Sequence, residues 1–144
     1  MSAPLLIVNP SSGREQGVAS SEEIVERLRE SGELRKAEEF FSAVMEREGK
    51  SSTVANGGVA FPHARTGLVE ELLLGIGRSR AGVSFGDSKN PVHLIFVIAV
   101  PQQMVNDYLI CVGSLARLLN DDKRRAVLMA AETPAEFFAE LRRE

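Results

Sequence analysis

The hydrophobic positions of the first fifty residues predict one strand followed by two helices. The apolar run at residues 5–8 has strand length, and the Asn-Pro-Ser-Ser-Gly stretch after it predicts a turn. The segment Ser20-Ser21-Glu22-Glu23 has the form of a capping box, so a short helix is expected from there to a stop near Gly32. A second helix is expected from about Lys36 to Glu48, ending at Gly49. The residues predicted to face the core from these helices are Ile24, Val25, Leu28, Phe40, Phe41, Val44 and Met45.

Three further segments have the pattern of strands. Residues 51–65 are first polar and then briefly apolar, which predicts a strand that delivers His63 to a loop-like position at its end. Residues 72–77 form another apolar run of strand length. Residues 91–100 are almost continuously apolar, as expected for a central strand covered on both faces.

The last forty residues have the spacing of helices. Apolar residues recur at helical intervals over 104–119, and a short helix is expected after residues 120–122. Thr133-Pro134-Ala135-Glu136 combines a cap, a proline at the first helical position and a glutamate at the third, which predicts the start of a final helix. Helices and strands that alternate in this way indicate an α/β sandwich around one sheet. We divide the chain into a strand and loop of uncertain role at 1–19 and a domain at 20–144.

Composition places the chain among ordinary globular proteins. Its 144 residues are enough for one domain, with 44% hydrophobic and 26% charged residues. The net charge is -3, and acidic and basic residues are interspersed along the chain. Because no basic field is available to gather phosphate backbones, nucleic acid is not expected as a partner.

The single cysteine and the short apolar runs indicate a cytoplasmic protein. Cys111 cannot form an internal disulfide, and the chain does not open with a secretory leader. The longest apolar runs fall far short of the roughly 20 residues that cross a bilayer. We therefore expect no direct membrane insertion.

His63 is the residue best suited to chemistry. The proline before it forces Phe61 into an extended conformation, and small or polar neighbours present the ring to solvent. An unprotonated imidazole nitrogen can attack phosphorus, and the phosphoramidate that forms can pass the group to another nucleophile. Backbone N–H groups and the guanidinium of Arg65 would stabilise the charge during transfer. On spacing alone, a surface histidine without a role remains the competing interpretation.

The sequence predicts neither a metal site nor a bound cofactor. His93 opens an apolar run, where a histidine commonly hydrogen-bonds a neighbour and does nothing more. Two histidines and one cysteine do not make the pattern of three or four zinc ligands. No Walker-type or dinucleotide glycine loop is present either, so phosphate must come from another protein.

Several motifs together resemble a known protein family. The motifs are, in chain order, Glu46-Arg47-Glu48, Ser51-Ser52-Thr53, Asn56-Gly57-Gly58-Val59-Ala60-Phe61-Pro62-His63-Ala64-Arg65, Gly75-Ile76-Gly77-Arg78-Ser79, Gly82-Val83-Ser84-Phe85, residues 91–101 and residues 114–119. They resemble the mannitol/fructose-type enzyme IIA domains of the bacterial phosphoenolpyruvate-dependent sugar phosphotransferase system, including their nitrogen-regulatory relatives. The resemblance covers roughly residues 20–144.

The resemblance implies a phosphocarrier. It implies a single domain with a mixed, roughly five-stranded sheet flanked by helices on both faces. His63 would accept phosphate from a histidine phosphocarrier protein and pass it to an enzyme IIB. Arg47 matches the family's arginine beside that histidine, which holds the charge and geometry of the site. Thr53 and Asn56 lie in the segment that lines the same pocket.

Tyr108 departs from the family pattern. The family usually carries a second histidine at the start of the helix that follows the Val-Pro strand end, and this chain has tyrosine there. A tyrosine hydroxyl is uncharged at neutral pH and can donate to a phosphoryl oxygen. Tyr108 would equally pack by its ring at helical spacing. The alternative function is therefore a regulatory binding module of the same fold that contacts a transporter, a kinase or a transcription factor, with or without phosphorylation of His63.

Overall fold

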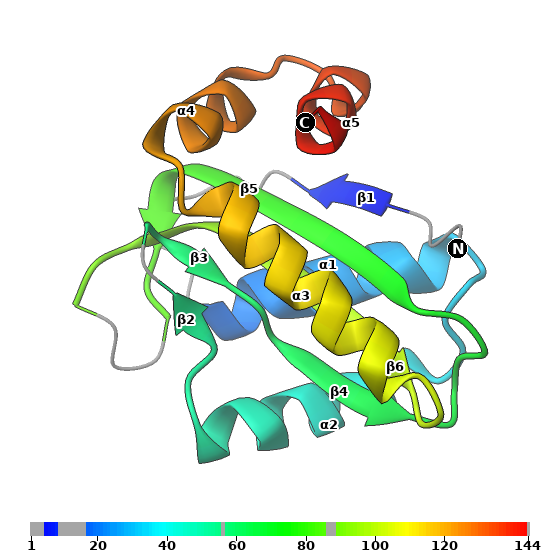
Figure 1. Cartoon of the computed structure of the whole chain (residues 1–144). Helices are drawn as coiled ribbons and strands as arrows, with labels where there is room; N and C mark the ends of the chain where they lie inside the picture. Colours follow the sequence, from blue (N-terminus) through cyan, green and yellow to red (C-terminus); the bar gives the residue numbers. More distant parts are fainter. Residues whose placement is uncertain (1–4, 9–16, 56, 86–88, 144) are drawn as a thin grey trace.

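The computed structural model describes residues 5–8, 17–55, 57–85 and 89–143. These residues form five helices and six strands (Figure 1). In chain order they are β1 (Leu5–Val8), α1 (Gly17–Glu30), α2 (Ala37–Lys50), β2 (Val54–Ala55), β3 (Val59–Ala60), β4 (His63–Thr66), β5 (Leu73–Val83), β6 (Val92–Pro101), α3 (Val105–Leu119), α4 (Asp122–Ala130) and α5 (Pro134–Arg142).

The six described strands occupy five positions across one mixed sheet, in the order β1, β5, β6, β3 with β4, and β2. Both β3 and β4 pair in parallel with the same edge of β6, one after the other along it. The two strands are separate because Pro62, which lies between them, has no N–H to donate to β6. The β1–β5 pair is parallel, whereas β5–β6 and β2–β3 are antiparallel. The predicted mixed sheet of roughly five strands is confirmed.

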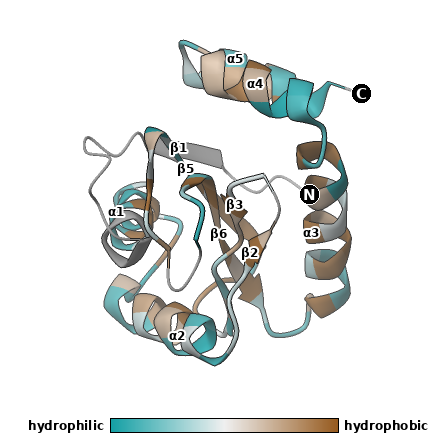
Figure 2. Cartoon of the chain, turned by 90° about the vertical axis from the view of Figure 1, so that its left-hand side faces the viewer, coloured by the Kyte–Doolittle hydropathy of each residue, from teal (hydrophilic) through white to brown (hydrophobic). Residues whose placement is uncertain are grey.

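Helices cover both faces of this sheet, as Figure 2 shows in side view. Strand β6 supplies alternate residues to two cores: Ile95, Val97 and Ala99 pack with α1 and α2, and Leu94, Phe96, Ile98 and Val100 pack with α3, α4 and α5. Burial on both faces explains why the strand is continuously apolar. The prediction of an α/β sandwich with helices on both faces is confirmed. No helix in the described part of the chain is both long and apolar enough to span a membrane.

Arg78 fastens α4 to the sheet from within the second core. Its side chain is buried, and its Nη1 donates to the carbonyls of Leu128 at 2.9 Å and Ala131 at 2.7 Å. The guanidinium also lies 5.9 Å from the centre of the Phe137 ring on α5. A buried cation is tolerated here because the carbonyls at the end of α4 offer partial negative charge.

Two predicted helix boundaries were wrong. Helix α1 begins at Gly17, so the Ser20–Glu23 segment lies inside a 14-residue helix and does not cap it, and the division drawn between residues 19 and 20 falls within α1. The side chains of Ile24 and Leu28 pack where a Cβ on Gly75 would stand, and this contact with β5 fixes the helix whichever residue begins it. Helix α2 continues past Gly49 to Lys50.

The other differences concern the strands, while the C-terminal cap is as predicted. Strand β5 runs six residues further than expected, to Val83. The polar stretch after α2 contains a small hairpin, β2–β3, that the pattern did not predict. At α5 the Thr133 hydroxyl accepts a hydrogen bond from the N–H of Glu136 at 3.1 Å, which confirms that cap.

Candidate functional site

The backbone of His63 is held by the central strand. His63 is the first residue of β4 and pairs with Ile98, and the carbonyl of Pro62 accepts a hydrogen bond from the N–H of Ile98 at 3.0 Å. The prediction of a loop-like position at the end of a strand was therefore wrong in detail: β6 resumes its pairing immediately after Pro62. The ring is half-buried, not fully presented to solvent. The residue thus sits on a rigid element.

The two nitrogens of His63 have different roles. Nδ1 lies 2.9 Å from the carbonyl oxygen of Phe61, and because a carbonyl can only accept, Nδ1 carries the proton. The lone pair is then on Nε2. Burial lowers the pKa of His63, the Phe61 carbonyl opposes this shift, and of the nearby charges Arg47 lowers the pKa while Glu48 raises it. At neutral pH the ring is an uncharged imidazole with a nucleophilic Nε2.

The Tyr108 side chain packs against this ring. The ring centres are 4.6 Å apart with the planes inclined by 33°, and the hydroxyl oxygen lies 3.0 Å from Nε2 and 3.1 Å from Nδ1 of His63. Burial raises the pKa of Tyr108, so the hydroxyl keeps its proton at neutral pH. Since Nδ1 already donates to Phe61, the acceptor for the tyrosine hydroxyl is Nε2.

A cleft of about 500 Å³ contains both rings. It lies where α2, β4 and the first turn of α3 meet, and Figure 1 shows these three elements at one end of the molecule. Three of its side chains are cationic and one is anionic, so the charge of the lining favours an anionic group. The residues that line it are Ala43, Glu46, Arg47, Lys50, His63, Ala64, Arg65, Val105 and Tyr108.

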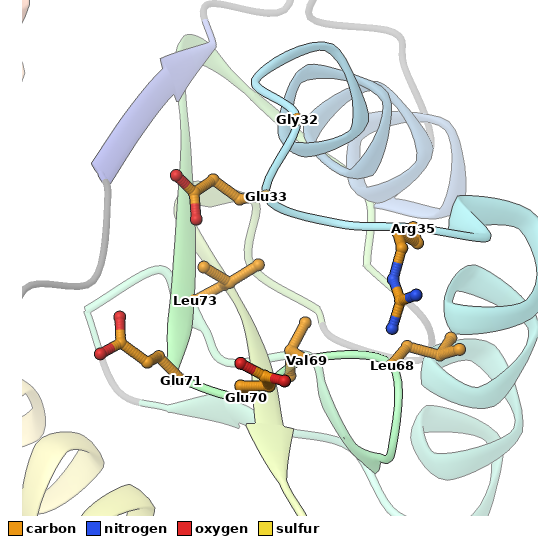
Figure 3. A pocket seen from close by; sticks show the side chains of 8 residues that line it. All are labelled: Gly32, Glu33, Arg35, Leu68, Val69, Glu70, Glu71 and Leu73. Carbon is orange, nitrogen blue, oxygen red and sulfur yellow. The ribbon is translucent and has the colours of Figure 1, made fainter.

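A second cleft has the opposite character. It lies between the α1–α2 connection and the segment before β5, with a volume of about 470 Å³ (Figure 3). Its charged lining residues are Glu33, Glu70, Glu71 and Arg35. With three carboxylates, one guanidinium and no histidine, it is poorly suited to a phosphoryl group. Elsewhere in the described ranges, no three His, Cys, Asp or Glu residues come together to hold a metal ion.

Comparison with known proteins identifies the family. The sequence profile described as "Phosphoenolpyruvate-dependent sugar phosphotransferase system, EIIA 2" matches residues 22–144. The chain belongs to this EIIA family. Members of the family are phosphotransferase components of sugar phosphotransferase systems. The family assignment agrees with the resemblance seen in the sequence motifs.

Two EIIA relatives come from different domains of life. The chain is 34% identical over 113 residues to the fructose-specific EIIABC component of Bacillus subtilis, covering 78% of this chain but only 18% of that protein. It is 32% identical over 106 residues to the fructose-specific EIIA component of Haloferax volcanii, covering 72% of this chain and 68% of that protein. Because the second relative is archaeal, membership of the EIIA family does not by itself assign the chain to a bacterium.

Solved EIIA structures share the fold. Nitrogen regulatory protein IIA-Ntr from Neisseria meningitidis is 27% identical with a TM-score of 0.82, covering 94% of this chain and 92% of that one. The mannitol enzyme IIA of Escherichia coli, in its complex with phosphorylated mannitol enzyme IIB, is 20% identical with a TM-score of 0.77, again covering 94% and 92%. At that identity the second comparison supports the fold alone.

The cleft around His63 brings together four of the six residues singled out in the sequence. His63, Arg47, Arg65 and Tyr108 all line it. Thr53 is not among the lining residues, and Asn56 lies outside the described residues. The Arg47 guanidinium donates from Nη1 to the carbonyl of Ser51 at 3.0 Å, which ties it to the end of α2.

Sequence reasoning missed three charged residues near the site. Glu46 lines the cleft as its one carboxylate. Lys50 lines the cleft, and its place one helical turn after Arg47 would have pointed to a shared face of α2. Glu48 acts on the pKa of His63 and binds Thr53. Neither residue type nor spacing in the sequence signals that Glu48 contact.

Proposed function

We propose that this EIIA protein is a phosphocarrier that accepts phosphate on Nε2 of His63 from a histidine phosphocarrier protein. It then delivers the group to an enzyme IIB or uses its phosphorylation state as a regulatory signal. The observation that carries the proposal is the assignment of the Nδ1 proton to the Phe61 carbonyl, which leaves Nε2 unprotonated in a cleft lined by three cations. A nucleophile with this protonation needs no separate base.

The proposed transfer exchanges one phosphorus–nitrogen bond for another. The Nε2 lone pair of His63 attacks the phosphorus of the donor's phosphohistidine, and the pair that held the phosphorus returns to the donor's nitrogen. The Nδ1–H of His63 stays bound to the Phe61 carbonyl, which accommodates the positive charge that the ring acquires. Transfer to enzyme IIB reverses these events, because the Nε2–phosphorus bond breaks and its electron pair returns to His63.

The surrounding side chains would stabilise the charge that moves. Arg47, Lys50 and Arg65 face the cleft in which the phosphoryl group arrives, and phosphoryl transfer depends mainly on positioning and on such charge stabilisation. The Tyr108 hydroxyl, now bound to Nε2, would turn to a phosphoryl oxygen as the new bond forms. Tyr108 would thereby supply a donor where the family usually has a second histidine.

The family membership also supports the proposed partners and location. The similar mannitol enzyme IIA from Escherichia coli has been solved with phosphorylated enzyme IIB, which supports an enzyme IIB as one recipient here. We place the phosphocarrier unit at residues 20–144, with β1 adding an edge strand to its sheet. Location in the cytoplasm, where phosphoenolpyruvate is available, belongs to the same proposal.

The proposal is tested by phosphorylation of the purified chain with phosphoenolpyruvate, enzyme I and histidine phosphocarrier protein. We expect an acid-labile gain in mass that is absent from His63→Ala. The matched control is His93→Gln, because His93 is the other histidine and its Nδ1 is bound to the carbonyl of Ser79 at 2.9 Å, outside the cleft. A labile adduct that persists in His63→Ala, or no adduct on the native chain, would contradict the proposal.

The second candidate function is a regulatory binding module. It is favoured by the tyrosine at position 108 and by the likeness to IIA-Ntr, which is named a nitrogen regulatory protein. Under this reading the chain switches its contact with a transporter, a kinase or a transcription factor and carries no phosphate to sugar. Replacing His63 by alanine in the source organism separates delivery to an enzyme IIB from a regulatory role, because only delivery to an enzyme IIB predicts a loss of sugar uptake.

A further inference from the structure

The carboxylate of Glu48 makes two hydrogen bonds to one residue of the segment after α2. The N–H of Thr53 donates to Oε2 at 2.8 Å, and the hydroxyl of Thr53 donates to Oε1 at 2.6 Å. Both side chains are half-buried. Because a carboxylate accepts on both oxygens at once, this pair fixes the start of the hairpin to the last turn of α2.

The backbone carbonyl of Thr53 is bound to the segment that precedes His63. The carbonyl of Thr53 accepts a hydrogen bond from the N–H of Phe61 at 3.3 Å. This bond continues the β2–β3 ladder, in which Val54 pairs with Ala60 and Ala55 with Val59. Each strand of that hairpin has only two residues, so the ladder is short, and the bonds to Glu48 add a contact at its open end.

Phe61 connects Thr53 to the ring of His63. Its ring is 5% exposed and stacks on Phe96 with the ring centres 5.6 Å apart, and its carbonyl accepts the Nδ1–H of His63 at 2.9 Å. The direction of that carbonyl decides which nitrogen of His63 is protonated. A series of three contacts thus leads from the Glu48 carboxylate to the Nδ1 proton.

We propose that Glu48 is a positioning residue, which acts through Thr53 and Phe61 to hold His63 as the Nδ1–H tautomer with Nε2 as the nucleophile. The consequence for phosphate uptake rests on the proposed function, whereas the tautomer itself does not. Glu48 is not among the residues that line the cleft. Its effect is on the orientation of the carbonyl that the imidazole binds.

The tautomer can be read directly by ¹⁵N NMR, because the chain has only two histidines. In the native chain we expect a protonated Nδ1 and an unprotonated Nε2 for His63. His93 provides an internal reference, because its Nδ1 is bound to the carbonyl of Ser79 and it takes no part in the contacts that lead from Glu48 to His63. In Glu48→Ala we expect a measurable fraction of the Nε2–H tautomer at His63 and an unchanged spectrum for His93.

Three further variants sharpen the test. Thr53→Val removes the hydroxyl but keeps the branched shape and the backbone N–H, so we expect a smaller shift of the tautomer in the same direction. Thr53→Ser keeps both donors and should restore the native spectrum. Glu39→Ala is the matched control, because Glu39 is an exposed glutamate on the same helix, outside the cleft. Thr53→Val also carries the test if Glu48→Ala does not fold.

The rate of phosphate uptake gives a second readout. Residues that orient the ligands of a catalytic metal contribute about 10- to 100-fold to activity. By analogy, we expect phosphate uptake by Glu48→Ala to be slower by about 10-fold. An unchanged His63 tautomer in both Glu48→Ala and Thr53→Val would overturn the proposal. If the native chain takes up no phosphate at all, the proposed function fails, and the NMR spectra still decide whether Glu48 positions His63.

Discussion

Replacing Tyr108 with phenylalanine removes one hydroxyl group and keeps the ring that packs on His63. In the resting state the hydroxyl donates to Nε2 at 3.0 Å, and such a bond between neutral groups contributes about 0.5–1.5 kcal/mol. In the proposed transition state it donates to a phosphoryl oxygen, and bonds to charged groups contribute about 1.5–3 kcal/mol. The hydroxyl therefore stabilises the transition state by about 1 kcal/mol more than the resting state, which predicts roughly fivefold slower phosphate uptake in Tyr108→Phe.

The assay is the initial rate of phosphate uptake from phosphorylated histidine phosphocarrier protein after rapid mixing, with both proteins well below saturation. Thermal unfolding of the variant controls for loss of folded protein. Tyr108→His is the companion variant, because its imidazole offers an N–H donor at the same position and should be faster than Tyr108→Phe.

The sign of the effect is what tests the reasoning. If the hydroxyl only occupied the Nε2 lone pair and never turned to the phosphoryl group, its removal would free the nucleophile and speed uptake by a factor of similar size. A rate for Tyr108→Phe at or above the native rate would therefore refute the proposed role of Tyr108.

Two further predictions concern pH and stability. Because burial lowers the pKa of His63, its NMR titration midpoint should lie below the ordinary value of about 6.5, and a midpoint at or above that value would contradict the burial seen here. The unfolded chain then binds more protons than the folded chain near this pH, so the contribution of His63 to stability should fall as the pH drops through about 6.5. Arg78→Met removes the guanidinium that donates to the buried carbonyls of Leu128 and Ala131, and Leu128 keeps only the 3.4 Å bond from the N–H of Ala131. The free energy of unfolding in urea titrations should fall by about 1–3 kcal/mol. The matched control Arg80→Met removes an exposed guanidinium on the same strand and should cost much less; an equal loss in both variants would exclude the role of the buried bonds.

The sheet and its covering helices could be predicted because burial imposes a pattern on the sequence. Strand β6 is apolar at every buried position because both of its faces are covered, and a continuous apolar run of this length is typical of such a strand. The cap of α5 could be predicted because the Thr133 hydroxyl accepts a hydrogen bond from an N–H only three residues along the chain, that of Glu136. Local capping interactions and burial on both faces of a strand can therefore both be recognised from the sequence alone.

The features that were missed depend on contacts between distant segments or on weak local signals. The β2–β3 hairpin has two residues in each strand, too few for a period to show, and its turn uses Gly57 and Gly58 with positive φ angles of 89° and 77°. The start of α1 was misplaced because Ser20–Glu23 is compatible with both a cap and a helix interior, and the local pattern does not distinguish the two. Contacts between distant segments can be predicted only once the fold is known.

The geometry of His63 also explains how a tyrosine can stand where the family usually has a second histidine. A neighbouring imidazole could serve either to set the tautomer of the reactive ring or to donate to the phosphoryl group. In this chain the backbone carbonyl of Phe61 already sets the tautomer, so the residue at position 108 needs only to donate, and a protonated hydroxyl does so. In the proposed transfer, the positive charge that an imidazolium would add comes instead from Arg47, Lys50 and Arg65, which line the same cleft from α2 and β4. With tyrosine at position 108, the site has one titrating group fewer than a site with two histidines. The contribution of residue 108 to the rate of phosphate uptake should therefore not change with pH in the range where a second histidine would titrate.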